Sequence, residues 1–401
     1  MNKKPPAHRT GTTTTRVTDS AKPVTVKQVR HRFLFGCSEF STLPYASNQM
    51  DATAHALAEK RYAHMAELFN SVTLPFYWGR YEPTKGQPDY ERMMKAARWL
   101  KDKGLVLKGH PLCWHTVCAP WLLDMTNTEI YETQLARIRR DVAAFDGVID
   151  MWDVINEAVI MPLFDKYDNG ITRICKERGR ISLIRDLFKE ARAANPKATF
   201  LINDFETSES YDILIEGLLE AGVPIEVIGI QSHMHQGCWS REKTQEILER
   251  FSRFNLPLHF TEVTLVSGHI MPREIVDLND YKIDNWPSTQ EGEARQAMET
   301  AAFYDALFAH PLVEAITWWS FHDGLWLGAP SGLINRASEP KPAYHALHER
   351  IKGDWWTKEH VLMADDSGNI TVTGVLGDYV AVCDGREVEF TIEKNNPGVM
   401  A

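Results

Sequence analysis

Basic residues are few relative to acidic ones in this sequence. Its 401 residues include 44 Lys and Arg against 54 Asp and Glu, which gives a formal net charge of −10. A protein that binds nucleic acid or an anionic membrane needs a basic face against the phosphate groups. We therefore expect no nucleic-acid partner and no membrane partner, and the acidic balance suits a neutral or weakly charged substrate.

Long apolar runs are also missing. No segment is apolar enough to read as a transmembrane helix, and the N-terminal segment has basic residues but no apolar signal-peptide core. We expect a secreted or periplasmic protein if a leader has been removed, and a cytoplasmic one if the chain is complete as given. The Thr- and Pro-rich opening predicts a flexible N-terminal tether over residues 1–25.

Patterns that hold metals and nucleotides are absent as well. Cys113 and Cys118 are separated by four residues, which is not a zinc spacing, and the other four cysteines form no second close pair. We expect free buried thiols, with a single disulfide as the alternative, and no metal site. No glycine-rich phosphate loop follows any predicted strand, so we expect no nucleotide and no other cofactor.

What the sequence does contain is a regular alternation of strand and helix signals. Amphipathic stretches with apolar residues at three- and four-residue spacing separate short β-rich apolar runs. This order predicts an α/β protein whose residues 26–352 form a closed (β/α)8 TIM barrel. The eight predicted strands lie at residues 33–40, 71–78, 105–112, 148–157, 198–206, 226–234, 256–263 and 314–321.

The last part of the chain has a different pattern. Residues 353–401 contain alternating runs separated by Asp-x-Gly and Gly-Asp turns, which predict three or four short antiparallel strands. We expect a small C-terminal β subdomain, docked on the barrel through Trp355 and Trp356.

Two carboxylates stand at the ends of predicted barrel strands. Glu157 closes the run MWDVINE, and Glu262 follows LPLHFT. The carboxyl ends of the strands line the active site of a TIM barrel. Hydrolysis of a glycosidic bond needs one carboxyl group to protonate the leaving oxygen and another to attack the anomeric carbon or to activate water. The pair therefore predicts a glycosidase.

Several motifs make the sequence resemble glycoside hydrolase family 10, the xylanase family. WDVINEA resembles the family's acid/base motif, and HFTEV resembles its nucleophile motif. The similarity runs from about residue 30 to residue 350, in the family's order and on the predicted strands. The further matching segments are KGHPLCWH (108–115), LINDFE (201–206), GIQSHMH (229–235), ITWWSFHD (316–323) and PKPAY (340–344).

The resemblance implies a retaining double displacement on β-1,4-xylan or xylo-oligosaccharides. Glu262 would be the nucleophile, held by a hydrogen bond from His233, and Glu157 the acid and then the base. Retention implies carboxyl groups about 5–5.5 Å apart. The residues expected to bind the substrate, a polysaccharide or oligosaccharide, are His110, Trp114, Asn156, Gln231, His233, Trp319, Trp326 and Trp78.

The sequence departs from the family pattern on the second predicted strand. The Glu, Asn and Lys that grip the glycone sugars in the family are absent, and Tyr77, Trp78 or Arg80 would take their place. This departure makes the glycone side more aromatic and alters the expected specificity. Glu206 also stands where the family has Asn, and long loops at 158–180 and 266–292 reshape the cleft.

Three alternatives remain. The first is the same mechanism on another β-glycan or β-glycoside, because the residues expected to bind the glycone sugars differ from those of the family. A catalytically silent glycan-binding barrel is disfavoured because both carboxylates are present. A metal-dependent hydrolase is disfavoured because no His-x-His pair lies on the first predicted strand. The oligomeric state is left open.

Overall fold

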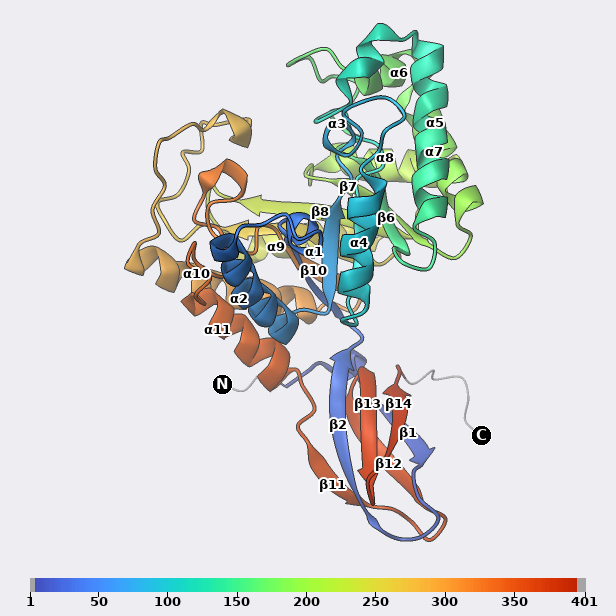
Figure 1. The fold of residues 1–401 in the computed structure, drawn as a ribbon, viewed down its shortest axis with the longest axis vertical. Coiled ribbons are helices and arrows are strands. Elements are labelled where there is room, and N and C mark those ends of the chain that lie inside the picture. Colours follow the sequence, from blue (N-terminus) through green and yellow to red (C-terminus); the bar gives the residue numbers. More distant parts are fainter. Residues whose placement is uncertain (1–3, 395–401) are drawn as a thin grey trace.

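The computed structural model describes residues 4–394, so the first three residues of the predicted tether and the last seven of the predicted C-terminal subdomain lie outside the described residues. A closed barrel of eight parallel strands forms the centre of the molecule (Figure 1). All eight predicted strands are confirmed. They are β3 (Leu34–Ser38), β4 (Ser71–Pro75), β5 (Val106–His110), β6 (Met151–Asn156), β7 (Thr199–Asp204), β8 (Val227–Met234), β9 (Leu258–Leu265) and β10 (Val313–Trp318).

Helices surround the barrel and bury one face against it, as the spacing of their apolar residues predicts. Side-chain caps define several of their starts; Thr126 and Glu129, for example, form a reciprocal capping box at α5. The helices that follow strands are α2 (Ala52–Leu68), α4 (Tyr90–Lys101), α5 (Asn127–Ala144), α7 (Arg180–Ala194), α8 (Glu209–Glu220), α9 (Arg241–Ser252), α10 (Gln290–Phe308) and α11 (Pro342–His348). Shorter helices lie in the loops: α1 (Thr42–Ala46), α3 (Trp78–Tyr81) and α6 (Gly170–Arg178).

A β appendage lies at one end of the barrel and takes strands from both ends of the chain (Figure 1). One sheet has the order β11-β2-β13-β14, and β1 pairs with β12 beside it. The strands are β1 (Thr10–Arg16), β2 (Pro23–His31), β11 (His360–Met363), β12 (Asn369–Val375), β13 (Gly377–Cys383) and β14 (Arg386–Ile392). The C-terminal antiparallel strands were predicted, and β1 and β2 were not.

The prediction of a flexible tether over residues 1–25 is therefore wrong for its strand-forming part. Threonine is β-branched and favours strands, and the repeated threonines of β1 alternate between the two faces of the pair with β12. Thr12 and Thr14 exchange hydroxyl hydrogen bonds with Thr373 and Thr371, at 2.8 and 3.0 Å. The polar, threonine-rich composition of this segment indicated disorder, but the segment forms a strand because β12 pairs with it.

Aromatic rings and one arginine join the appendage to the barrel. Trp355 is buried and stacks on Phe308 of α10 with ring centroids 4.1 Å apart, and Trp356 packs edge-on against His31. The guanidinium of Arg9 donates to the carbonyl oxygens of Phe308, His310 and Val313 at 2.5–3.0 Å. It therefore satisfies carbonyl groups around the last turn of α10 and the start of β10.

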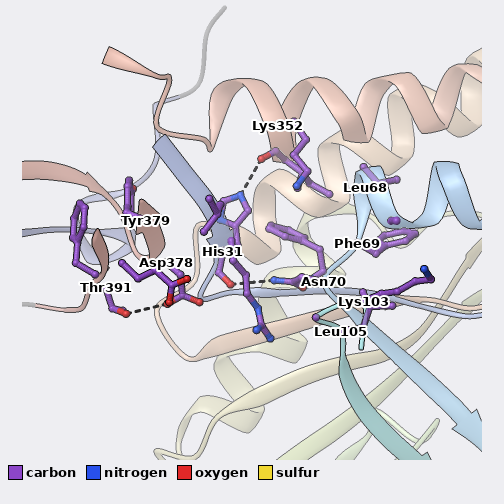
Figure 2. A pocket seen from close by; sticks show the side chains of 18 residues that line it. His31, Leu68, Phe69, Asn70, Lys103, Leu105, Lys352, Asp378, Tyr379 and Thr391 are labelled. Atoms are coloured by element: carbon purple, nitrogen blue, oxygen red, sulfur yellow. Dashed lines mark hydrogen bonds between the residues drawn. The ribbon is translucent and has the colours of Figure 1, made fainter. Parts of the chain in front are cut away.

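A pocket of about 490 Å³ opens at this junction (Figure 2). His31, Asn70 and Leu105 line it. His31 lies shortly before the first barrel strand, β3, and Asn70 and Leu105 directly precede β4 and β5. The pocket is therefore at the amino-terminal end of the barrel, opposite the end where catalytic side chains gather in this fold.

Replacing Arg9 by Ala is expected to destabilise the fold by roughly 2–4 kcal/mol, because three carbonyl groups lose a charged donor. Activity per folded molecule should not change, because Arg9 lies at the far end from the catalytic carboxylates. Urea unfolding measures the first effect. Lys27→Ala, which breaks an exposed ion pair with Glu359, is the control and should cost less than about 1 kcal/mol. Equal effects of the two variants would contradict the role of Arg9.

Candidate active site

The carboxyl ends of β6 and β9 present the two predicted catalytic carboxylates. Glu157 directly follows β6, and Glu262 lies within β9. Regular alternation would place Asn156 and Glu157 on opposite sides of the strand. Two local features change this: the β6–β7 register shifts between Asp153 and Ile155, and Glu157 has a φ of 54°. This left-handed conformation is strained for glutamate, and strain of this kind is typical of functional sites.

Glu262 is held as a carboxylate. His233 Nε2 lies 3.0 Å from its Oε2, as predicted, and Asn203 Nδ2 donates to its Oε1 at 2.9 Å. His110 Nε2 approaches Oε1 at 3.9 Å. Burial alone would raise the pKa of Glu262, but the charges of His110 and His233 and the hydrogen bond from His233 outweigh it, so the pKa lies below its usual value.

Glu157 is held in the opposite protonation state. Burial, together with the negative charges of Asp204 and Glu262, raises the pKa of Glu157 to about 8, although hydrogen bonds from Trp114 and Gln231 act against the rise. Trp114 Nε1 donates to Oε2 at 2.8 Å. A buried carboxyl group that keeps its proton near neutral pH can act as a general acid.

Side-chain amides connect the two carboxyl groups. Asn156 Oδ1 accepts hydrogen bonds from Asn203 Nδ2 at 2.8 Å and from Gln231 Nε2 at 3.1 Å. Asn203 also reaches Glu262, and Gln231 approaches Glu157 Oε1 at 3.4 Å. We call this set of Asn156, Asn203 and Gln231 the amide bridge. It fixes both carboxyl groups within one hydrogen-bonded network.

A buried cluster of charged side chains, formed by Lys108, His110 and Asp153, packs beside Glu262. His110 Nδ1 lies 2.7 Å from Asp153 Oδ2, and Lys108 Nζ lies 2.9 Å from the same oxygen. Burial would raise the pKa of Asp153, but the charges of Lys108 and His110 lower it below its usual value. The ionised Asp153 orients the His110 ring, whose other nitrogen faces Glu262. Sequence reasoning did not assign Lys108 or Asn203 to the site, although both lie inside motifs it singled out.

Two of the predicted tryptophans lie at the same end of the barrel. The Trp319 ring contacts His110 and His233, with centroids 5.3 and 6.3 Å apart. Trp326 covers His233 at 4.5 Å and His235 at 5.0 Å. Each therefore borders the network around Glu262.

The prediction for Trp78 is wrong. Its Nε1 donates to Glu82 Oε2 at 3.1 Å, and its ring packs against Trp121 and beneath the guanidinium of Arg137. The side chain is buried by these contacts and offers no surface to a substrate. The neighbouring Tyr77 faces the site instead. Burial and the negative charge of Glu262 raise the pKa of the Tyr77 phenol well above its usual value.

Within residues 4–394, no group of three or more His, Cys, Asp or Glu side chains is placed to hold a metal ion. No helix among these residues has the length and apolar character required to cross a bilayer. All six cysteines are free, four of them buried, as expected.

The model of Glycosyl hydrolase family 10 matches residues 39–350. The chain belongs to this family. It is therefore a glycoside hydrolase, and the retaining chemistry of family 10 agrees with the opposite protonation states of its two carboxyl groups.

Relatives of this family 10 enzyme are distant. Endo-1,4-beta-xylanase B of Thermotoga neapolitana is 27% identical over 296 residues, covering 69% of this chain and 78% of the relative. Endo-1,4-beta-xylanase/feruloyl esterase of Xylanibacter ruminicola is 26% identical over 223 residues, covering 49% of this chain but only 30% of the relative. The structure of xylanase 10B from Thermotoga maritima matches with a TM-score of 0.64 and 23% identity, over 80% of this chain and 95% of that one.

The two pKa shifts predict a bell-shaped pH dependence of kcat/KM. Activity should rise as Glu262 loses its proton, at a pH below the ordinary range for glutamate, and fall as Glu157 loses its proton near pH 8. Initial rates on an oligosaccharide across the pH range measure both limbs. The Glu157→Gln variant, assayed on an activated aryl glycoside, should lack the basic limb. A basic limb that persists in this variant would assign it to another group.

Proposed function

We propose that this family 10 enzyme hydrolyses β-1,4-xylan or xylo-oligosaccharides by double displacement, with Glu262 as nucleophile and Glu157 as acid/base. The observation that carries the proposal is the opposite pKa shift of two carboxyl groups joined by one amide bridge. Pairs of titratable groups whose environments separate their pKa values mark acid and base roles. The names of the relatives, several of them endo-1,4-beta-xylanases, support xylan as the substrate.

In the first step, Glu262 attacks the anomeric carbon while the bond from this carbon to the leaving oxygen breaks. The proton of Glu157 moves to that oxygen, so the leaving group departs as a neutral alcohol. In the second step, the Glu157 carboxylate takes a proton from water, and the hydroxide attacks the same carbon and displaces Glu262. Both carboxyl groups then return to their starting protonation states.

The remaining predicted residues have groups available for the cleaved sugar. Asn156 Oδ1 already accepts two hydrogen bonds within the amide bridge, and one N–H of its Nδ2 reaches Glu157 Oε1 at 3.4 Å. The second N–H of Nδ2 is left to donate, and we assign it to the sugar 2-hydroxyl. Hydrogen bonds to this hydroxyl strengthen in the transition state. His110, Trp114, Gln231 and His233 would contact the other hydroxyl groups, and Trp319 and Trp326 would face the apolar side of the ring.

A second candidate is the same mechanism on another β-glycoside. The position of Tyr77 favours it, because an aromatic side chain from the end of β4 borders the site where the family places polar glycone contacts.

Product stereochemistry tests the proposal. Proton NMR of xylo-oligosaccharide hydrolysis should show the β-anomer first, before mutarotation, because two inversions restore the configuration. Initial formation of the α-anomer would exclude double displacement. Hydrolysis of β-glucans but not of xylo-oligosaccharides would favour the second candidate.

Variants of the two glutamates separate their roles. Glu262→Ala should abolish turnover of every substrate, because no glycosyl-enzyme intermediate forms. Glu157→Ala should lose about 10²–10⁴-fold on xylo-oligosaccharides, yet release a good leaving group such as a dinitrophenolate far more readily, since that group needs no proton. Equal losses on both substrate types would argue against Glu157 as the acid.

A further inference from the structure

Ring contacts form a continuous wall around one half of the catalytic end. The Trp114 ring contacts Tyr77 at 5.6 Å, Tyr77 contacts Phe40 at 5.9 Å, and Phe40 contacts Trp319 at 5.6 Å between centroids. We call these four residues the aromatic arc. Centroid distances of this size mean rings in direct contact. Consecutive members therefore leave no passage between them for a sugar unit.

The arc continues at one end and packs on the site along its inner side. Beyond Trp319, the rings of His233 and Trp326 extend it at 6.3 and 4.5 Å. His110, which faces Glu262, lies inside the arc and contacts Tyr77 at 5.7 Å and Trp319 at 5.3 Å. The arc thus borders the network that holds the nucleophile.

The position of Glu157 shows which side of the substrate meets the arc. The proton donor must face the leaving oxygen, so the leaving group lies along the loop that follows Glu157. His115 Nε2 lies 3.8 Å from Glu157 Oε2. The rings of His115, Phe164 and Tyr167 then form a row of contacts that ends at the surface, where Tyr167 is 44% exposed. The rest of the glycone must point the other way. β6, which Glu157 follows, lies across the barrel from β10, and β3 and β4, which are followed by Phe40 and Tyr77, are the next strands beyond β10.

On the leaving-group side, the loops around the site are joined by exposed ion pairs and not by packed aromatic rings. The loop after β6 meets the loop after β9 through Lys166, whose ammonium lies 2.6 Å from both Asp277 and Asp280. These side chains are 39–60% exposed, and exposed ion pairs contribute little to stability. This contact can open for a substrate, whereas the packed rings of the arc cannot separate without losing buried apolar contact.

We infer that the active site is a blind pocket, closed on the glycone side by Tyr77 and Phe40, which accepts a single terminal sugar and cleaves the bond behind it. This inference rests on the proposed function and specifies it as removal of the non-reducing terminal unit. Tyr77 and Phe40 are then specificity-determining residues, and internal bonds of a long chain do not reach the carboxylates.

Matched nitrophenyl glycosides test the inference. The wild type should release nitrophenol from the β-xyloside directly, and from the β-xylobioside only after a lag in which the terminal xylose is removed. The β-glucoside and β-cellobioside form a second pair: nitrophenol should be released directly from the β-glucoside and only after a lag from the β-cellobioside. On xylohexaose labelled at its reducing end, the first labelled product should be one unit shorter. Immediate nitrophenol release from a disaccharide, or mid-chain products from xylohexaose, would overturn the blind pocket and leave the proposed function standing.

Variants of the arc identify the residues that close it. The Phe40→Ala, Tyr77→Ala double variant should gain direct release from the disaccharide glycosides by at least about tenfold relative to the wild type. Tyr77→Phe keeps the ring and should keep the lag, whatever its rate. A folded double variant that gains nothing would overturn the role of the two residues; if it does not fold, the wild-type product pattern decides. Turnover of none of the four glycosides, nor of xylohexaose, would instead remove the proposed function and the inference with it.

Discussion

The burial of two carboxyl groups within one hydrogen-bonded network is the constraint on which the rest of the site depends. A buried charge is costly unless it is paired, and two neighbouring carboxylates also repel each other. The surroundings of the two carboxyl groups shift their pKa values in opposite directions. Glu262 is surrounded by His233, His110 and Asn203, which favour the ionised form. His115 Nε2 lies 3.8 Å from Glu157 Oε2, but burial lowers the pKa of His115 to about 4, so this ring carries no charge near neutral pH. Glu157 is therefore held protonated by burial. The chemical difference between the proposed nucleophile and the proposed acid follows from this asymmetry.

The amide bridge keeps the two groups in a fixed relation. Asn203 is itself oriented by Thr261 of β9, whose hydroxyl donates to its Oδ1 at 2.6 Å, so that its amide nitrogen faces both Asn156 and Glu262. Neighbouring strands of a closed barrel cannot slide without breaking a ladder of hydrogen bonds on each side. The positions of the carboxyl groups are therefore determined by strand register, which is a more rigid support than a loop.

The strands, and the positions of Glu157 and Glu262 at strand ends, were predictable from the sequence because a parallel strand buried on both faces has a nearly continuous apolar run, and side chains at the carboxyl ends of barrel strands line the rim. Other features were not. β1 escaped prediction because a threonine-rich segment resembles a linker until its partner β12, more than 350 residues away in sequence, is known. Trp78 was predicted to bind the substrate, with Tyr77 or Arg80 as alternatives, because the sequence did not show where this strand ends. β4 ends at Pro75 and Trp78 begins the short helix α3, so Tyr77 and not Trp78 faces the site.

The rim of the barrel divides into two halves with different tasks. β6 to β9 supply Glu157, the amide bridge, His233 and Glu262, while Phe40, Tyr77 and Trp319 follow β3, β4 and β10. In the proposed reaction the first half carries proton transfer and nucleophilic attack, and these need fixed polar atoms at short distances from one carbon. In the proposed complex the second half meets the glycone through aromatic faces, where shape matters more than any single hydrogen bond. Aromatic residues can therefore replace polar ones in that half, and alter which sugars enter, without disturbing the pKa difference that drives the reaction.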